Sequence, residues 1–199
     1  MNSEQIGHIA VRFNEVFQSL KAESDRGCVL VVASMIEQIL ENYICRCLVP
    51  KVSSEDELLS RSGNKPISSF SAKINLAYRL GLIPREEHRI YHQLRELRNA
   101  CAHNIDRQDF VANHFKDRTR NIIKNSAATW EALQSLVAPI FQPNKPATVE
   151  EFVEKLGWRV AFALYFAVVV SYKETAIVHV PRLRVLRETV KPPRMQATP

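Results

Sequence analysis

Glycine is scarce in this sequence, with five residues among 199. Folds built from β-strands need glycine in their tight turns, so its scarcity disfavours an all-β protein and favours helices. Hydrophobic residues make up 46% of the chain, which argues against intrinsic disorder. The length is sufficient for one domain with its own core, or for one domain with a short appendage.

The sequence also lacks a long uninterrupted hydrophobic run. The most apolar stretch extends from Val160 to Val170, and a helix that crosses a bilayer needs about 20 apolar residues. The N-terminal residues do not combine a basic segment with an apolar one, as a secretory signal would. These absences predict a soluble cytoplasmic protein without a membrane segment.

None of the four cysteines forms a Cys-x-x-Cys pair, and three of them fall within apolar helical segments. Buried, reduced thiols are the expected state for such residues, which indicates a reducing compartment. The cysteines are Cys28, Cys45, Cys47 and Cys101.

The motifs of the common enzyme classes are missing. The chain contains no nucleophile elbow, phosphate loop, dinucleotide fingerprint or zinc-finger spacing. We therefore predict no cofactor, and a non-enzymatic role is favoured over catalysis.

What the sequence does contain is an excess of positive charge, concentrated at its C-terminus. The formal net charge is +6, and five basic residues with one acid, Glu188, put most of it in the last part of the chain. Such a tail is suited to phosphate or to an acidic partner, although a solvated terminus has the same composition. The basic run 118–124 would add phosphate contacts. The basic tail residues are Arg182, Arg184, Arg187, Lys191 and Arg194.

Hydrophobic periodicity and capping residues predict a single-domain, all-α bundle of about six to eight helices with a long apolar C-terminal helix. Residues 1–175 form the helical domain, and residues 176–199 form a basic, proline-containing tail. Residues 176–180 are expected to be extended. The expected helices cover residues 3–21, 25–49, 69–80, 85–102, 109–136 with one break near Asp117, and 148–173, with a short capped helix at residues 53–57.

Two of these helices are apolar on more than one side. Residues 25–49 carry one apolar face through Val29, Ile36 and Tyr43 and a second through Leu30 and Ile44, and residues 158–172 are apolar all round. Such helices lie at the centre of a bundle or are shared with a second subunit. A homodimer is therefore predicted.

The helix over residues 85–103 separates its faces clearly on a helical wheel. Its core side carries Ile90, Leu94, Leu97 and Cys101, while the opposite side is unusually rich in nitrogen-bearing side chains. His88, His92 and Glu96, one turn apart, could hold a metal, but no known spacing marks a further ligand, so no metal site is predicted. The polar side consists of His88, His92, Arg95, Asn99 and His103.

Arg98 and His103 at the end of this helix suggest a catalytic alternative. A metal-independent ribonuclease could use histidine to transfer a proton and arginine to stabilise charge on phosphate. Five helical residues place the two side chains about 140° apart, so they would meet only if the helix ended near Cys101 or across a dimer axis. The structural alternative is that Arg98 bonds an acid such as Asp25 or Glu37 and His103 caps the helix.

Three blocks in order resemble the mannitol operon repressor family: residues 22–31, 67–83 and 94–103. The resemblance covers roughly residues 23–136 and implies an all-helical fold with a regulatory role exerted through partners. The family's Asp-Arg and Arg-Asn-x-x-Ala-His elements fall on Asp25-Arg26 and on Arg98-Asn99 with Ala102-His103. The last block is also similar to the Arg-x4-His motif of HEPN domains, some of which are toxin ribonucleases.

The sequence thus supports two functional hypotheses. The first is a transcriptional regulator that acts as a helical dimer with a protein partner, with nucleic acid, or with both, through Asp25, Arg26, His92, Arg95 and Asn99. Within this hypothesis Asp25 pairs with Arg98 or Arg95. The alternative is a HEPN-type ribonuclease with Arg98 and His103 as catalytic residues.

Overall fold

The computed structural model describes residues 3–59, 65–103, 113–141 and 146–185, without the side chains of residues 3, 103, 114, 139 and 140. Within these ranges the chain forms helices and no strand, so the predicted all-α fold with a long apolar C-terminal helix is confirmed. The helices are α1 (Ser3–Ala22), α2 (Asp25–Cys47), α3 (Phe70–Arg79), α4 (Arg85–His103), α5 (Asn113–Lys124), α6 (Ala127–Val137), α7 (Val149–Leu156) and α8 (Trp158–Ala176), with short 3₁₀ helices η1 (Ala138–Phe141) and η2 (Ile177–His179).

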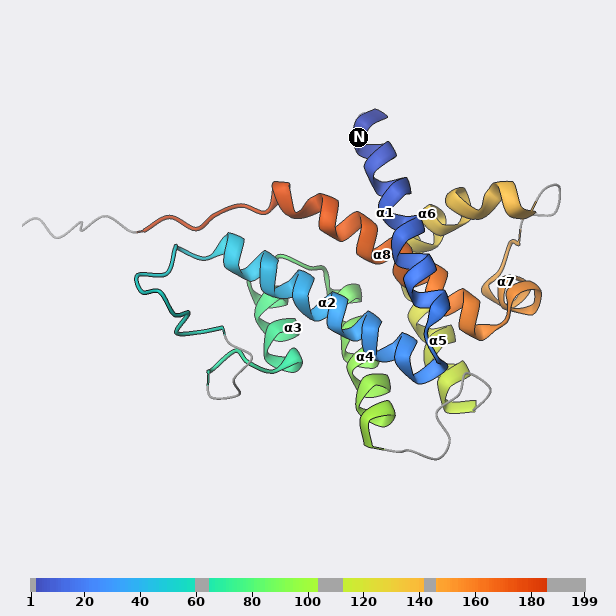
Figure 1. The fold of residues 1–199 in the computed structure, drawn as a ribbon, viewed down its shortest axis with the longest axis horizontal. Coiled ribbons are helices and arrows are strands. Elements are labelled where there is room, and N and C mark those ends of the chain that lie inside the picture. The colour runs from blue at the N-terminus through green and yellow to red at the C-terminus, as the bar shows by residue number, and fades with distance from the viewer. Residues whose placement is uncertain (1–2, 60–64, 104–112, 142–145, 186–199) are drawn as a thin grey trace, which may run out of the picture.

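Helices α2 and α8 form the centre of the molecule. Every side chain from Ala161 to Ser171 in α8 is buried, because α1, α2, α5, α6 and α7 all contact this helix. Helix α1 lies across α8, and α3 and α4 cover the other side of α2 (Figure 1). The two-sided apolar character of α2 follows from this position between two groups of helices.

Two segments, Asp25–Cys47 and Trp158–His179, are long and apolar enough to cross a membrane by length and composition alone. In the most apolar part of the first segment 50% of the residues are buried inside the molecule, and in that of the second segment 61% are buried. Packing in the core accounts for their apolar composition. The prediction of a protein without a membrane segment stays a prediction.

Three helices begin with a side-chain cap. The hydroxyls of Ser24, Ser69 and Thr148 accept hydrogen bonds from the backbone N–H groups of Gly27, Ala72 and Glu151. Glu151 in turn accepts from the backbone of Ala147 at 2.8 Å. Gly81, with φ of 71°, follows the end of α3 in the left-handed conformation that glycine favours.

The prediction of a short helix at residues 53–57 is wrong. The chain between Leu48 and Leu59 is irregular, because side chains there bond the local backbone instead of capping a helix. The Asp56 carboxylate accepts from the N–H groups of Leu58 and Leu59, both at 2.9 Å, and the Ser53 hydroxyl donates to the carbonyl of Glu55.

Two helix boundaries also differ from the prediction. The break expected near Asp117 lies between α5 and α6, where the side chain of Asn125 and its backbone N–H both donate to the carbonyl of Asn121. The helix expected to run without interruption from residue 148 is divided at Gly157 into α7 and α8. Gly157 has φ of 80° and ψ of 156°, a backbone region almost restricted to glycine.

The extended conformation predicted for residues 176–180 is found at Val180 alone, since α8 continues to Ala176 and is followed by η2. Beyond η2, the backbone N–H of Leu183 donates to the carbonyl of Cys47 at 2.7 Å, which places this part of the tail against the end of α2. The remaining basic tail residues, Arg187, Lys191 and Arg194, lie outside the described residues.

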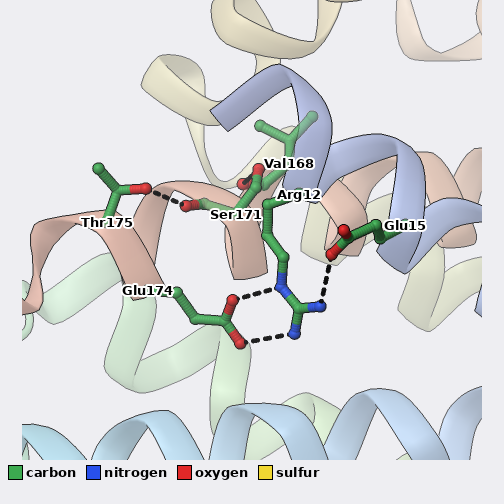
Figure 2. Close-up of polar contacts among 6 residues, drawn as sticks. All are labelled: Arg12, Glu15, Val168, Ser171, Glu174 and Thr175. Atoms are coloured by element: carbon green, nitrogen blue, oxygen red, sulfur yellow. Dashed lines mark hydrogen bonds and ion pairs between the residues drawn. The ribbon is translucent and has the colours of Figure 1, made fainter. Parts of the chain in front are cut away.

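Polar contacts fasten the outer helices to the central ones. Arg12 of α1 forms a two-pronged ion pair with Glu174 of α8 and also contacts Glu15 (Figure 2). The ammonium group of Lys73 in α3 is buried, and it lies 2.9 Å from Glu37 and 2.8 Å from Glu41 of α2. Buried charge is tolerated there because both carboxylates accept hydrogen bonds from it.

All four cysteines are free thiols, and the burial predicted for them is found in three. Cys28, Cys47 and Cys101 are buried, whereas Cys45 is exposed. Burial raises the pKa of the Cys28 thiol to about 12, although the nearby Arg159 lowers it. This thiol is protonated and unreactive at neutral pH.

Candidate functional site

Two histidines of α4 converge on one side chain of α3. The Nε2 atoms of His88 and His92 lie 2.9 Å and 3.1 Å from the same oxygen, Oδ1 of Asn75. The two imidazole rings meet edge to face with centroids 4.6 Å apart. In the tautomer with hydrogen on Nε2, both rings donate to a single acceptor.

The surroundings of this pair are aromatic and partly exposed. Tyr78 of α3 places its ring 4.7 Å from the ring of His88. Burial lowers the pKa of His92, and the charges of His88 and Arg95 lower it further, whereas Glu96 raises it. His92 is therefore neutral at physiological pH.

Further along α4, Arg95 is half-buried. Its Nε atom is shielded from solvent and has no hydrogen-bond partner within the described residues. An unpartnered buried donor costs free energy unless a partner arrives from outside the chain. The guanidinium of Arg98 is exposed, and its Nη1 atom donates to Asn99 Oδ1 at 3.3 Å.

The arginines around the histidines are not neutralised by carboxylates. Glu87 and Glu96 of α4 pair with Lys173 and Arg118 instead. Over the described ranges no ion pair involves Arg79, Arg85, Arg89, Arg95 or Arg98. We call the surface formed by Asn75, Tyr78, Arg79, Arg85, His88, Arg89, His92, Arg95 and Asn99 the α3–α4 face.

The basic run 118–124 has a different character. Arg118 pairs with Glu96, Arg120 with Asp117 and Glu150, and Lys124 with Glu150. Arg120 also lies over the ring of Trp158. These cations hold α5 against α4 and α7, so they are less available to an outside ligand than the α3–α4 face.

The predicted pair Asp25-Arg26 lies at the start of α2. The Asp25 carboxylate pairs with Arg159 of α8 at 3.1 Å. The predicted pairing of Asp25 with Arg95 or Arg98 is wrong, because neither arginine forms an ion pair within the described residues. Burial raises the pKa of the Cys101 thiol to about 11, and the positive charge of Arg26 opposes this increase. Arg26 therefore lies close to Cys101. Arg26 is thus near the C-terminal part of α4.

Of the predicted site residues, the structure groups His92, Arg95 and Asn99 on one side of α4 and places Arg98 beside Asn99. The His103 side chain lies outside the described residues. Asn75 and Tyr78 were missed: Tyr78 lies one helical turn from the buried Ile74, a spacing that favours a place in the core, and yet its side chain is exposed. No group of three His, Cys, Asp or Glu residues suited to a metal occurs in the described part.

No family model matches this sequence, and no curated protein and no solved structure matches the chain.

Proposed function

We propose that this protein is a regulatory nucleic-acid-binding protein and that the α3–α4 face contacts the phosphate backbone. The observation that carries the proposal is the group of arginines on this face, beside two histidines, that pair with no carboxylate of the described residues. Arginine is suited to phosphate because its planar guanidinium offers several donors and is always charged. Phosphate contacts supply affinity without sequence recognition.

The histidine pair adds geometry to this charge. Two Nε2 atoms that converge on one carbonyl oxygen also define a position for a phosphate oxygen. Asn75 is exposed, so its side chain can turn away when a ligand replaces it.

Binding is tested by fluorescence anisotropy with labelled duplex DNA and single-stranded RNA over a range of salt concentrations. The variant Arg85→Gln/Arg89→Gln should bind about tenfold more weakly, and the slope of its salt dependence should fall by about one unit for each phosphate that it no longer neutralises. The matched control is Lys21→Gln/Lys51→Gln, which removes the same charge from exposed positions on α1 and on the segment after α2. It should bind nearly as the wild type does.

Equal losses of affinity in the two variants would mean that net charge alone drives association. Absence of binding to either nucleic acid would overturn the proposal. An acidic polypeptide such as polyglutamate, which carries no phosphate, serves as the third probe. If it binds as tightly as nucleic acid does, the partner is an acidic protein instead.

The regulatory part of the proposal is transcriptional control by a cytoplasmic homodimer. It rests on the resemblance of the three sequence blocks to the mannitol operon repressor family. Both central helices are covered by other helices of the same chain, so a dimer would use an outer surface. Light scattering on the purified protein measures the oligomer, and a monomer at micromolar concentration would contradict this part.

The exposed, acid-free guanidinium of Arg98 favours one second candidate, a metal-independent ribonuclease with Arg98 and His103. The test is incubation of the protein with total RNA in the presence of a chelator, beside a His103→Ala variant. Cleavage that disappears in the variant would replace the binding function with the catalytic one.

A further inference from the structure

A pocket of about 310 Å³ lies between α4, α6 and α8. No Cα atom of α4 comes within 8 Å of one in α6 or α8 among the described residues, so α4 is farther from these helices than directly packed helices are. Long side chains span the gap instead, and alanines at positions 128, 132 and 176 leave part of it empty.

The pocket has apolar walls and one charged end. Ile90, Val168 and Val169 contribute the walls, together with the alanines. At the charged end, Lys173 of α8 lies 2.6 Å from Glu87 of α4, and both side chains are about one-fifth exposed. A volume at the lower end of the range for ligand sites, with few polar groups in an apolar lining, is typical of a small-molecule pocket.

The charged pair retains unused bonding capacity. An ammonium group has three donors, and Glu87 is the one partner of the Lys173 ammonium among the described residues. The Glu87 carboxylate forms its ion pair with Lys173 through Oε1 and accepts from the Tyr91 hydroxyl on Oε2. A carboxylate has about four acceptor positions, so two remain.

The groups that hold the pair are themselves fixed. The Tyr43 hydroxyl donates to the backbone carbonyl of Lys173 at 2.7 Å. Tyr91 and Tyr165, which also line the pocket, are buried. Both charges therefore stand at defined positions on one end of an apolar cavity.

We propose that this pocket binds a zwitterionic small molecule with an apolar body, of which an α-amino acid with a large apolar side chain is the simplest form. The ligand carboxylate binds Lys173, its ammonium binds Glu87, and its side chain fills the space between α6 and α8. The two charges of the ligand and those of Lys173 and Glu87 then alternate in sign, so the existing ion pair stays intact. The proposal is independent of the nucleic-acid function of the α3–α4 face.

Isothermal titration calorimetry with L-phenylalanine tests the proposal, with 3-phenylpropionate and phenethylamine as probes that each keep one charge. The wild type should bind phenylalanine at millimolar concentration or tighter, and each single-charge analogue about tenfold more weakly. Lys173→Met and the pocket-filling Ala132→Leu should each weaken phenylalanine binding by about tenfold.

The matched control is Lys124→Met, which removes a lysine from an exposed ion pair with Glu150 outside the pocket. It should bind phenylalanine as the wild type does, and circular dichroism identifies any variant that fails to fold. Because Ala132→Leu keeps both charges, it tests the location even if Lys173→Met is unstable. Failure of the wild type to bind phenylalanine would overturn the proposal, as would equal affinity for 3-phenylpropionate or unchanged binding in the folded Ala132→Leu variant.

Discussion

Asn75 shows how one exposed side chain can organise two others. Its Oδ1 atom holds both His88 and His92, which lie one turn apart on α4 and would otherwise sample several rotamers. Because it comes from α3, the orientation of the imidazoles depends on how α3 packs on α4. The site is therefore a property of the helix pair and not of α4 alone.

His92 makes stability depend on pH. Burial first, then the charges of His88 and Arg95, lower its pKa below the ordinary value, against the opposing effect of Glu96. As pH falls through about 6.5, the unfolded chain takes up this proton before the folded one does, so acid favours unfolding. When the pH is lowered from about 7.5 to about 5.5, the free energy of unfolding of the wild type should therefore fall. In the His92→Gln variant it should fall less.

Urea unfolding at the two pH values measures this difference. The control is His8→Gln, which removes an exposed histidine on α1, and it should keep the acid-induced loss seen in the wild type. If His92→Gln loses as much stability on acidification as the wild type does, the assignment to His92 is wrong.

Residue-level prediction succeeded where the cause is local. The caps at Ser24, Ser69 and Thr148 bond residues three positions away, so spacing in the sequence is enough to place them. Partners that are distant in the chain leave no such signal. Arg159 meets Asp25 from 134 positions away, and Lys73 meets Glu37 from 36, so these contacts follow from the packing of helices and not from any motif.

At the scale of elements, Gly157 decides the geometry of the C-terminal part. The apolar residues before and after Gly157 fit the periodicity of one continuous helix. The prediction therefore joined α7 to α8. The backbone conformation of Gly157 turns the chain instead, so that α7 folds back against α8. A single glycine in an apolar helical pattern is an ambiguous signal.

The substitution Gly157→Ala should lower the free energy of unfolding by about 1–3 kcal/mol, the cost of a side chain in this backbone region. A Cβ atom there would meet nothing within 4 Å, so the effect reports conformation and not a clash. Thermal and urea unfolding with far-UV circular dichroism measure it.

The opposite sign is expected for Gly7→Ala in α1. Gly7 lies inside a helix, and a Cβ atom would again meet nothing within 4 Å. Alanine should stabilise the protein by about 0.5–1 kcal/mol there, through the lower entropy of the unfolded chain. Destabilisation by both substitutions would show that the glycines act through contacts and not through backbone freedom.

At the scale of the whole molecule, the apolar helices were predicted to be central or shared between subunits. Burial of all side chains from Ala161 to Ser171 within one chain selects the central position. The pocket between α4, α6 and α8 could not be foreseen, since its lining combines residues from three helices whose relative spacing no periodicity encodes. The same holds for the α3–α4 face, because the sequence does not say which arginines lack a carboxylate partner among the described residues.

Arg159 joins three helices at one point and should therefore matter to the stability of the entire domain. From the start of α8 it donates to the backbone carbonyls of Leu20 in the last turn of α1 and of Glu23 just after α1, and to Asp25 at the start of α2. Its side chain is 21% exposed, whereas Arg12, which links α1 to α8, is 39% exposed. Solvent screens the second pair more strongly.

Arg159→Met should lower the free energy of unfolding by roughly 2–4 kcal/mol, because it leaves a half-buried carboxylate and two carbonyls without their donor. Arg12→Met should cost less than about 1 kcal/mol, as exposed ion pairs do. Arg159→Lys keeps the charge but offers fewer directed donors, so its loss of stability should fall between these values. Urea unfolding followed by circular dichroism ranks the three variants. Equal losses of stability for Arg159→Met and Arg12→Met would contradict a central role for the Arg159 junction, because the two variants would then differ only in which surface ion pair was removed.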